Sequence, residues 1–260
     1  MGTATEQGNM WGARARDFAE ANEPAWTPVF SAALDAAGAG PGTRLLDIGC
    51  GTGGALVLAR QRGAEVAGLD AAASSVGIAR QRLPGAQIEV GEMEELPFAS
   101  RSFDIAMGIN SFQFAGNIVN ALAEAGRVVR GGGTVAMLVW GRREDSDLLS
   151  KVMPAVFALL PPPPADAPKP MPLAEPGAVE KIMEEAGLLP KDAREFAAAL
   201  EFPTLDVALR AIMSAAARAI RHAGEDRVRQ AVEGALQPAI QPDGTVRLDN
   251  RFRIVAAERR

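Results

Sequence analysis

The 260-residue chain has no tyrosine, one histidine and one cysteine. These scarcities exclude a zinc cluster of cysteines and histidines, a catalytic pair of histidines and an internal disulfide bond. They also exclude a reductase that depends on a catalytic tyrosine. A single cysteine, Cys50, fits a reducing compartment, so we expect a cytoplasmic protein.

The sequence also lacks a long apolar run and a surplus of basic residues. No stretch approaches the ~20 apolar residues that a membrane-spanning helix needs. Residues 1–10 are polar and contain no apolar signal-peptide core. Acidic residues outnumber basic ones by 32 to 27, a net charge of −5. A nucleic acid is therefore not an expected partner, because binding its phosphates needs a basic face.

What the chain does have is a regular alternation of segments typical of strands and helices. Strands are predicted at 44–48, 65–70, 87–91, 103–109, 133–140, 194–202 and 245–257. Helices are predicted at 53–62, 73–82, 117–129, 145–160, 175–187, 204–222 and 225–236. This order predicts an α/β fold with a doubly wound, mostly parallel sheet and helices on both faces.

Two proline-containing segments interrupt this regular pattern. Residues 10–37 are typical of helix, and we expect Pro24 and Pro28 to divide them into two helices. Half of the eighteen prolines fall between Pro154 and Pro176, which predicts an irregular, stiff excursion. Three units are expected: N-terminal helices at 1–40, a core at 41–141, and a segment at 142–260 that completes the sheet. The last segment is expected to contain helical cap insertions at about 142–175 and 203–240.

The most informative stretch is RLLDIGCGTGG, residues 44–54. Here a buried strand ends in a glycine loop that opens a helix, which brings the backbone close to a ligand. Asp47 stands two residues before the first glycine of the loop and would repel a bound anion. The loop therefore favours a ligand with a cationic or neutral part, and S-adenosylmethionine has both an ammonium and a sulfonium group.

The glycine spacing G-x-G-x-x-G also matches the dinucleotide fingerprint, so NAD is an alternative ligand. The next strand ends in Asp70, whose carboxylate can accept hydrogen bonds from both hydroxyls of a ribose in either cofactor. After the third strand, Glu92 and Met93 place an acid beside an apolar side chain. That pair suits the amino group and the ring of adenine.

The run LLDIGCGTG resembles the first motif of class I S-adenosylmethionine-dependent methyltransferases. Later motifs of the family occur in the same order, at 68–70, 91–98 with 102–104, 124–129 and 131–133. The similarity covers about residues 40–140 and is closest to the small-molecule branch, which includes quinone-biosynthesis and natural-product enzymes. It implies a Rossmann-like seven-stranded sheet with a helical cap. The implied enzyme moves a methyl group to a small organic acceptor and releases S-adenosylhomocysteine.

The resemblance also assigns roles to individual residues. The implied cofactor-binding residues are Trp11, Asp47, Gly49, Cys50, Gly51, Asp70, Ala71, Glu92, Met93 and Asn110. Asp47 and the loop backbone would face the methionine part, and Trp11 would belong to a lid, with ordinary helix packing as its alternative role. Related enzymes usually have aspartate where this chain has Glu92, and a bulkier apolar residue where it has Ala71.

The acceptor pocket is expected beyond Asn110, at the end of the fourth predicted strand. Its candidate substrate-binding residues are Ser111, Phe112, Gln113, Phe114 and Trp140, which predict an apolar or aromatic small molecule. The residues after Asn110 differ from the Asn-Pro-Pro-aromatic tetrad of methyltransferases that act on amino groups of adenine or glutamine. A DNA or protein acceptor is therefore disfavoured.

Methyl transfer from a sulfonium is an in-line displacement that needs a base only when the acceptor loses a proton. His222 is the one side chain that titrates near neutral pH unperturbed, so it is the candidate catalytic base. Capping of the last carbonyls of its helix is the alternative. For the whole chain, the alternatives are a catalytically silent binding protein of the same fold and an NAD-dependent oxidoreductase. No metal site is expected.

Overall fold

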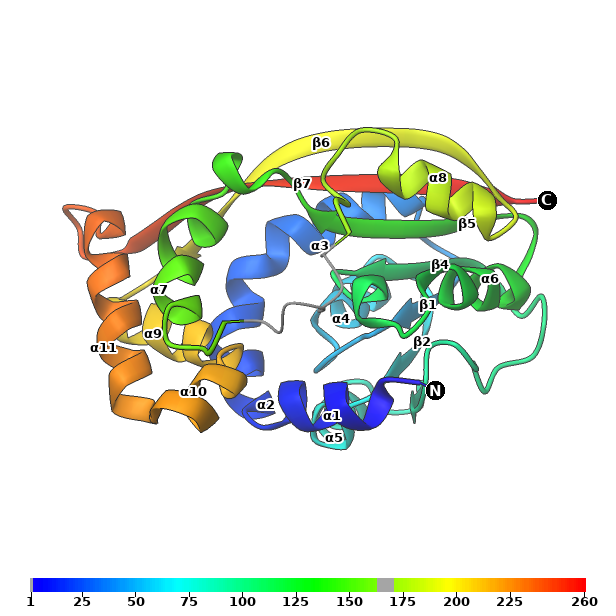
Figure 1. Ribbon diagram of the computed structural model, residues 1–260. Helices are drawn as coiled ribbons and strands as arrows, with labels where there is room; N and C mark the ends of the chain where they lie inside the picture. The colour runs from blue at the N-terminus through cyan, green and yellow to red at the C-terminus, as the bar shows by residue number, and fades with distance from the viewer. Residues whose placement is uncertain (1, 163–170) are drawn as a thin grey trace.

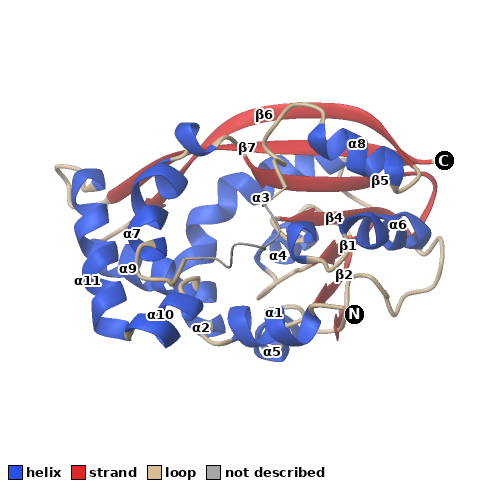
Figure 2. Ribbon diagram, viewed as in Figure 1, coloured by secondary structure: helices blue, strands red, loops and turns tan. Residues whose placement is uncertain are grey.

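The computed structural model describes residues 2–162 and 171–260. Its centre is a seven-stranded sheet in the order β3-β2-β1-β4-β5-β7-β6 (Figures 1 and 2). The strands are β1 (Arg44–Ile48), β2 (Glu65–Asp70), β3 (Gln87–Val90), β4 (Phe103–Ile109), β5 (Val129–Trp140), β6 (Leu188–Phe202) and β7 (Val246–Arg259). Strands β1 to β5 are parallel, and β7 is antiparallel to β5 and β6. The predicted α/β fold with a seven-stranded, mostly parallel sheet is confirmed.

The strand order reverses at β1, which pairs with β2 on one side and with β4 on the other. Open α/β sheets bind ligands at such a reversal, outside the carboxyl ends of the strands. The apolar side chains of β1, Leu45, Leu46 and Ile48, are fully buried, which fixes this strand in the middle of the sheet. The glycine loop follows directly, so it lies at the reversal point.

Helices cover the sheet and extend beyond it into a cap (Figure 1). The helices between strands are α4 (Gly54–Gln61), α5 (Ala73–Arg82), α6 (Ile118–Val128) and α8 (Ala178–Glu185), with a short 3-10 turn η2 (Phe112–Phe114) after β4. The cap consists of η4 (Leu148–Val152), α7 (Met153–Phe157), α9 (Leu205–Ser214), α10 (Ala217–Ala223) and α11 (Glu225–Leu236). One buried cluster, which includes Val152, Leu209, Val228 and Phe252, joins the cap to the sheet.

The N-terminal segment forms a series of short helices followed by one long helix. They are α1 (Ala4–Gly12), α2 (Ala15–Asp17), the π-helical turn η1 (Phe18–Asn22) and α3 (Glu23–Ala37). The predicted break at Pro28 is wrong, because Pro28 lies inside α3. A proline at this position leaves the carbonyl of Pro24 without its helical donor. The hydroxyl of Thr27 donates to that carbonyl at 2.9 Å and replaces the missing hydrogen bond.

Several predicted boundaries differ from the observed ones. Strand β6 begins at Leu188 and not at 194, because residues 188–193 also pair with β7, with a register shift between Pro190 and Asp192. The predicted helix 204–222 is divided into α9 and α10. Within the predicted proline-rich excursion, residues 163–170 lie outside the described residues. The division of the chain at 40 and 141 stays a prediction. None of the described helices has both the length and the apolar character needed to cross a membrane.

Candidate functional site

Among the described residues, six buried polar side-chain atoms have no hydrogen-bond partner, and four of them lie at two neighbouring strand ends. These four are Oδ1 of Asp47, both polar atoms of the Asn110 amide, and Oε1 of Gln113; the other two belong to Glu180 and Arg253. Asp47 is on β1, and Asn110 and Gln113 follow the parallel neighbour β4. Since buried polar groups in folded proteins are almost always hydrogen-bonded, these four atoms are the ones that a bound ligand would satisfy.

The glycine loop uses its N–H groups inside the protein. Gly49 and Cys50 both donate to the carbonyl of Leu69, at 2.7 and 3.0 Å. Gly51 donates to Oδ2 of Asp70 at 2.8 Å. A phosphate site needs such N–H groups free and pointing at the ligand. This loop therefore lacks the anion cradle of a dinucleotide site.

The N-terminus of α4 is also occupied by an anion of the protein itself. The carboxylate of Glu23, on α3, is 4% exposed and accepts hydrogen bonds from the hydroxyl of Thr52 at 2.6 Å and from the N–H of Gly54 at 3.0 Å. It also pairs with Arg82. In a Rossmann dinucleotide site the pyrophosphate sits at this helix end, so Glu23 argues against NAD.

The carboxyl groups of Asp47, Asp70 and Glu23 lie near one another at the carboxyl end of β1. Asp47 is 2% exposed, and its burial, followed by the charges of Asp70 and Glu23, raises its pKa to about 8. Burial also raises the pKa of Asp70, against the lowering effect of N–H groups that donate to it. Ionised carboxylates that are unfavourable without a counterion favour a cationic ligand. The carboxyl groups and the loop N–H groups, which are already hydrogen-bonded within the protein, therefore both favour a cationic ligand over an anionic one.

Asp70 is held in one orientation by two backbone groups. Its Oδ1 accepts from the N–H of Ala72 at 2.8 Å, and its Oδ2 accepts from Gly51. A carboxylate has about four acceptor positions, so each oxygen keeps one for a ligand hydroxyl. This geometry is suitable for the predicted bidentate contact with a ribose.

The turn after β4 places the candidate acceptor residues. Asn110 has a φ of +51°, in the left-handed region that asparagine tolerates better than most residues. The next hydroxyl, of Ser111, donates to the carbonyl of Ile48 at 2.5 Å and ties the ends of β4 and β1 together. A Cβ on Gly49 would lie 2.3 Å from the Ser111 Cβ, so this contact requires glycine.

Comparison with known proteins identifies the central segment. Residues 46–137 match a family described as "Methyltransferase domain". Residues 46–137 are called the methyltransferase domain below, after this match. It runs from β1 into β5 and contains the glycine loop, Asp70, Glu92 and Asn110. The predicted resemblance to class I methyltransferases is confirmed.

The similar curated proteins match over only part of this chain. The malonyl-[acyl-carrier protein] O-methyltransferase of Serratia marcescens is 38% identical over 95 residues, which cover 36% of this chain and 37% of that protein. The protein of the same name from Methylococcus capsulatus is 34% identical over 113 residues, 42% of this chain and 41% of that protein. The chain thus spans only about two fifths of the length of these relatives.

Solved structures with the methyltransferase fold cover most of the chain. Geranyl diphosphate C-methyltransferase from Streptomyces coelicolor, in complex with Mg²⁺, geranyl diphosphate and S-adenosyl-L-homocysteine, has a TM-score of 0.57 and 16% identity, over 99% of this chain and 98% of that one. The [4+2]-cyclase SpnF has a TM-score of 0.56 and 18% identity, over 89% and 80%. At these identities the similarity establishes the fold.

In the methyltransferase domain, the loop after β3 contains the residues predicted to bind adenine. The carboxylate of Glu92 accepts hydrogen bonds from its own neighbour, the N–H of Met93, and from the N–H of Ala4, both at 2.9 Å. The Met93 side chain is partly buried against the core. Farther along the loop, Arg127 donates to the carbonyls of Leu96 and Phe98 and holds the loop against α6.

The predicted acceptor residues have different surroundings. Ser111 and Phe112 are buried, with Phe112 fully enclosed in the core, whereas Gln113 and Phe114 are partly exposed. Trp140 packs against Trp26 and Phe252, with ring centroids 5.3 and 4.7 Å away, between the sheet and the cap. The structure therefore leaves Gln113 and Phe114 as the members of the run best placed to meet an acceptor.

The remaining two predicted residues lie on helices outside the methyltransferase domain. The Trp11 ring on α1 packs edge-on against Phe114, with centroids 5.4 Å apart, and its Nε1 donates to Gln7 at 3.2 Å. His222 is exposed in the last turn of α10. Among the described residues, no hydrogen bond joins His222 to the strand ends of β1 and β4.

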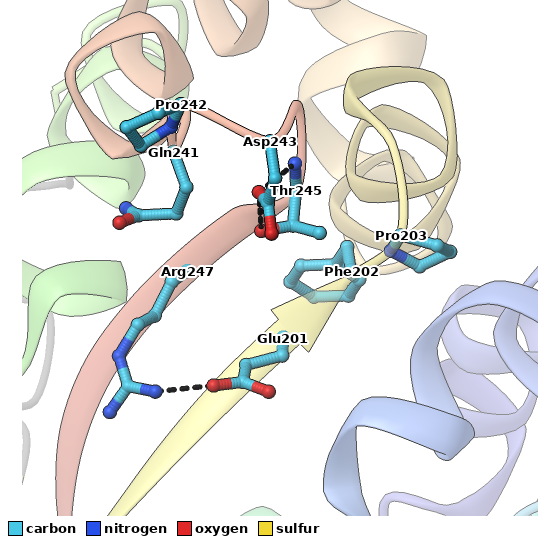
Figure 3. A pocket seen from close by; sticks show the side chains of 8 residues that line it. All are labelled: Glu201, Phe202, Pro203, Gln241, Pro242, Asp243, Thr245 and Arg247. Atoms are coloured by element: carbon cyan, nitrogen blue, oxygen red, sulfur yellow. Dashed lines mark hydrogen bonds and ion pairs between the residues drawn. The ribbon is translucent and has the colours of Figure 1, made fainter.

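A surface hollow lies where β6 ends and β7 begins, outside the methyltransferase domain (Figure 3). Its polar side chains satisfy one another: Arg247 pairs with Glu201, and Asp243 accepts from both the N–H and the hydroxyl of Thr245. It contains no predicted site residue, and none of its described atoms is a buried polar group without a partner. Within 2–162 and 171–260, no group of three or more metal-ligating side chains is present.

Glu23 cannot be identified from the local sequence, which does not distinguish it from the exposed acids near it. Glu23→Ala would leave the Thr52 hydroxyl, the Gly54 N–H and the Arg82 guanidinium without their shared acceptor. We expect a loss of about 2–4 kcal/mol in the free energy of unfolding, measured by urea denaturation.

The control is Glu20→Ala, three residues earlier, where the side chain is half exposed and pairs with Arg210 at the surface. An exposed ion pair contributes about 0–1 kcal/mol, so this variant should unfold close to the wild type. Equal losses in the two variants would contradict the role given to Glu23.

Proposed function

We propose that the protein transfers a methyl group from S-adenosylmethionine to a small organic acceptor by in-line displacement. One observation carries the proposal: unpartnered buried groups of Asp47 and Asn110 lie beside a loop whose N–H groups are already bonded. Such a site recognises a cationic amino acid and not a phosphate. The match of residues 46–137 to a methyltransferase domain supports the same conclusion.

The proposed cofactor contacts follow the strand ends. Asp47 and the carbonyls of the glycine loop face the ammonium group, and Asn110 lies beside the methionine part. Asp70 accepts the ribose hydroxyls, and Glu92 with Met93 receives adenine. The cofactor supplies a methyl group on a sulfonium, which is an activated leaving group. The residues of the protein hold the acceptor in line with that methyl group and exclude water.

The proposed acceptor is a small apolar or aromatic molecule that meets Gln113 and Phe114. The geranyl diphosphate enzyme, which has the same fold, is named for an acceptor that has an apolar chain. A second candidate is a malonyl group on an acyl carrier protein, because the similar curated proteins are named for that acceptor. The similarity to them covers only about two fifths of this chain. A cytoplasmic location remains our proposal.

Calorimetric titration with S-adenosylhomocysteine and with NAD⁺ tests the cofactor. We expect binding of the first and none of the second, and the reverse would refute the proposal. A panel of prenyl diphosphates, phenols and malonyl-carrier protein, incubated with methyl-labelled S-adenosylmethionine, then tests the acceptor. Cofactor binding without label transfer to any member would favour the alternative of a silent binding protein or another reaction on the same fold, as in the cyclase SpnF.

Removal of the Asp70 carboxylate should weaken cofactor binding. Asp70→Ala is expected to raise the Kd for S-adenosylhomocysteine more than tenfold, because charge-assisted hydrogen bonds worth roughly 1.5–3 kcal/mol are lost. Asp35→Ala, which removes an exposed carboxylate on α3, is the control and should leave the Kd unchanged. A Kd within twofold of the wild type for Asp70→Ala would contradict the ribose contact.

Cofactor binding should depend on the ionisation of Asp47. With a pKa of about 8, Asp47 is mostly protonated in the ligand-free protein at pH 6, and the ligand ammonium prefers the ionised form. The affinity for S-adenosylhomocysteine should therefore rise from pH 6 to pH 8, by at most about tenfold per pH unit. Titrations in buffers of different ionisation enthalpy should show a proton released on binding at pH 6.

The raised pKa of Asp47 also affects the stability of the ligand-free protein, which should fall as the pH rises. A carboxyl group whose pKa is raised on folding favours the unfolded state as the pH rises from about 4 to 8, because only the unfolded chain ionises freely. Asp47→Asn should therefore raise the Tm at pH 8 and remove most of the pH dependence of binding. A binding profile for wild type that is flat from pH 6 to 8 would show that Asp47 does not face the ligand cation.

His222→Ala tests the candidate base. We expect the Kd for S-adenosylhomocysteine to be unchanged, since His222 is exposed on the cap and joins no described hydrogen bond at the strand ends. Turnover with an acceptor that must lose a proton then decides whether His222 is a catalytic base or caps the end of its helix. A loss of turnover identifies a base, whereas full turnover leaves His222 as a helix-end residue.

A further inference from the structure

The start of α4 has no capping side chain of its own. The residue at its N-cap position is Gly53, whose φ is +88° and which has no side chain to accept from the first N–H groups of the helix. The acceptor comes from α3, where the Glu23 carboxylate accepts from the N–H of Gly54 and the hydroxyl of Thr52, 31 and 29 residues away in sequence. A carboxylate from a distant segment therefore completes this helix end.

The third glycine of the G-x-G-x-x-G pattern, Gly54, fits against this carboxylate. A Cβ on Gly54 would lie 2.8 Å from Cδ of Glu23 and 2.9 Å from a ring carbon of Phe30. A larger residue at this position would therefore push the carboxylate away from the helix end. In a dinucleotide site the last glycine of the pattern allows close packing of helix and strand. In this protein it also leaves space for a side chain of α3.

The groups around the Glu23 carboxylate are those of an anion site. A backbone N–H at a helix start, a hydroxyl and the guanidinium of Arg82 all contact this one carboxylate. Thr52, which provides the hydroxyl, is fully buried. Helix N-termini and arginine side chains are groups that hold phosphates and carboxylates in proteins. Glu23 is thus held as an anionic ligand would be, although it belongs to the chain.

A hollow of about 210 Å³ between α3 and α4 borders this anion position. Glu23, Gly54 and Arg82 form part of its lining. Among the described residues, no hydrogen bond uses Nε or Nη2 of Arg82, whose side chain is 35% exposed. An external anion would therefore have a route to the helix end and further donors along it. The Glu23 carboxylate is the group that occupies the position.

We propose that Glu23 determines the class of ligand that the glycine loop accepts: its carboxylate fills the anion position at the start of α4 and excludes phosphate-bearing nucleotides. Glu23 is a positioning residue in this role, because it acts through Thr52, Gly54 and Arg82 and not on a reacting group. The inference rests on the proposed function, since it assigns the preference for S-adenosylmethionine over a dinucleotide to one residue. An ordinary helix cap is the alternative role, and its removal would lower stability without creating an anion site.

The decisive variant is Glu23→Ala, which removes the occupant and leaves its donors in place. The probe is pyrophosphate, titrated by calorimetry at constant ionic strength. We expect the variant to bind one pyrophosphate per chain at least tenfold more tightly than the wild type does. Its Tm should also rise with pyrophosphate, because a ligand that binds only the folded state stabilises it. Glu20→Ala, which removes an exposed carboxylate, is the control and should behave as the wild type does.

Two further variants distinguish a specific anion site from a general effect of salt. Adding Arg82→Met to Glu23→Ala removes the guanidinium, so the Kd for pyrophosphate should rise about tenfold or more relative to Glu23→Ala. Glu23→Gln keeps the shape of the side chain and an acceptor for Thr52 and Gly54, and it serves if Glu23→Ala does not fold. Its loss of negative charge should let pyrophosphate bind beside Arg82 at least tenfold more tightly than in the wild type.

The inference and the proposed function fail separately. Absence of S-adenosylhomocysteine binding by the wild type would refute the proposed function. If the wild type binds S-adenosylhomocysteine but the Glu23 variants that fold bind no pyrophosphate, Glu23 is a helix cap only and the inference is refuted. Pyrophosphate binding by the wild type as tight as that of the variants would also refute it, because Glu23 would then exclude nothing.

Discussion

A buried negative charge at the end of β1 is the constraint on which the rest of the site depends. Asp47 is enclosed, has a free oxygen and lies near two further carboxylates, those of Asp70 and Glu23. A folded chain tolerates such a group only if it is neutralised by a proton or by a cation. The ligand-free protein uses the proton, and the pKa of about 8 expresses that cost. In the proposed function, the ammonium group of the cofactor takes the place of that proton.

The surrounding structure is arranged to keep this end of the sheet negative. In a dinucleotide site, the loop N–H groups and the helix N-terminus attract an anionic ligand. Here Leu69 and Asp70 accept the N–H groups of the loop, and Glu23 occupies the helix end with help from Arg82. The positive partial charges of the motif are thus compensated within the protein. The same glycine pattern can therefore serve two classes of cofactor, and the partners of its N–H groups decide between them.

Local sequence was sufficient where a single strand and its loop determine the structure. It predicted all seven strands and the resemblance to methyltransferases. It also placed Asp47, Asp70 and Asn110 at or just after the ends of β1, β2 and β4. It failed where distant segments determine the outcome. Glu23 acts through Thr52 and Gly54, about thirty residues away. The helix continues through Pro28 because a neighbouring hydroxyl replaces the lost donor. The first half of β6 contains a proline and several charged residues, and it is a strand because β7 pairs with it.

The parts that distinguish this protein from others of its fold lie around the matched domain. A cyclase and a C-methyltransferase both share the sheet, so the strands alone do not determine the reaction. Helix α1 contacts the predicted adenine loop through Ala4 and the acceptor turn through Thr3, and Trp11 packs on Phe114. A movement of α1 would therefore alter both sides of the site together. One helix outside residues 46–137 thus contacts both predicted sides of the site.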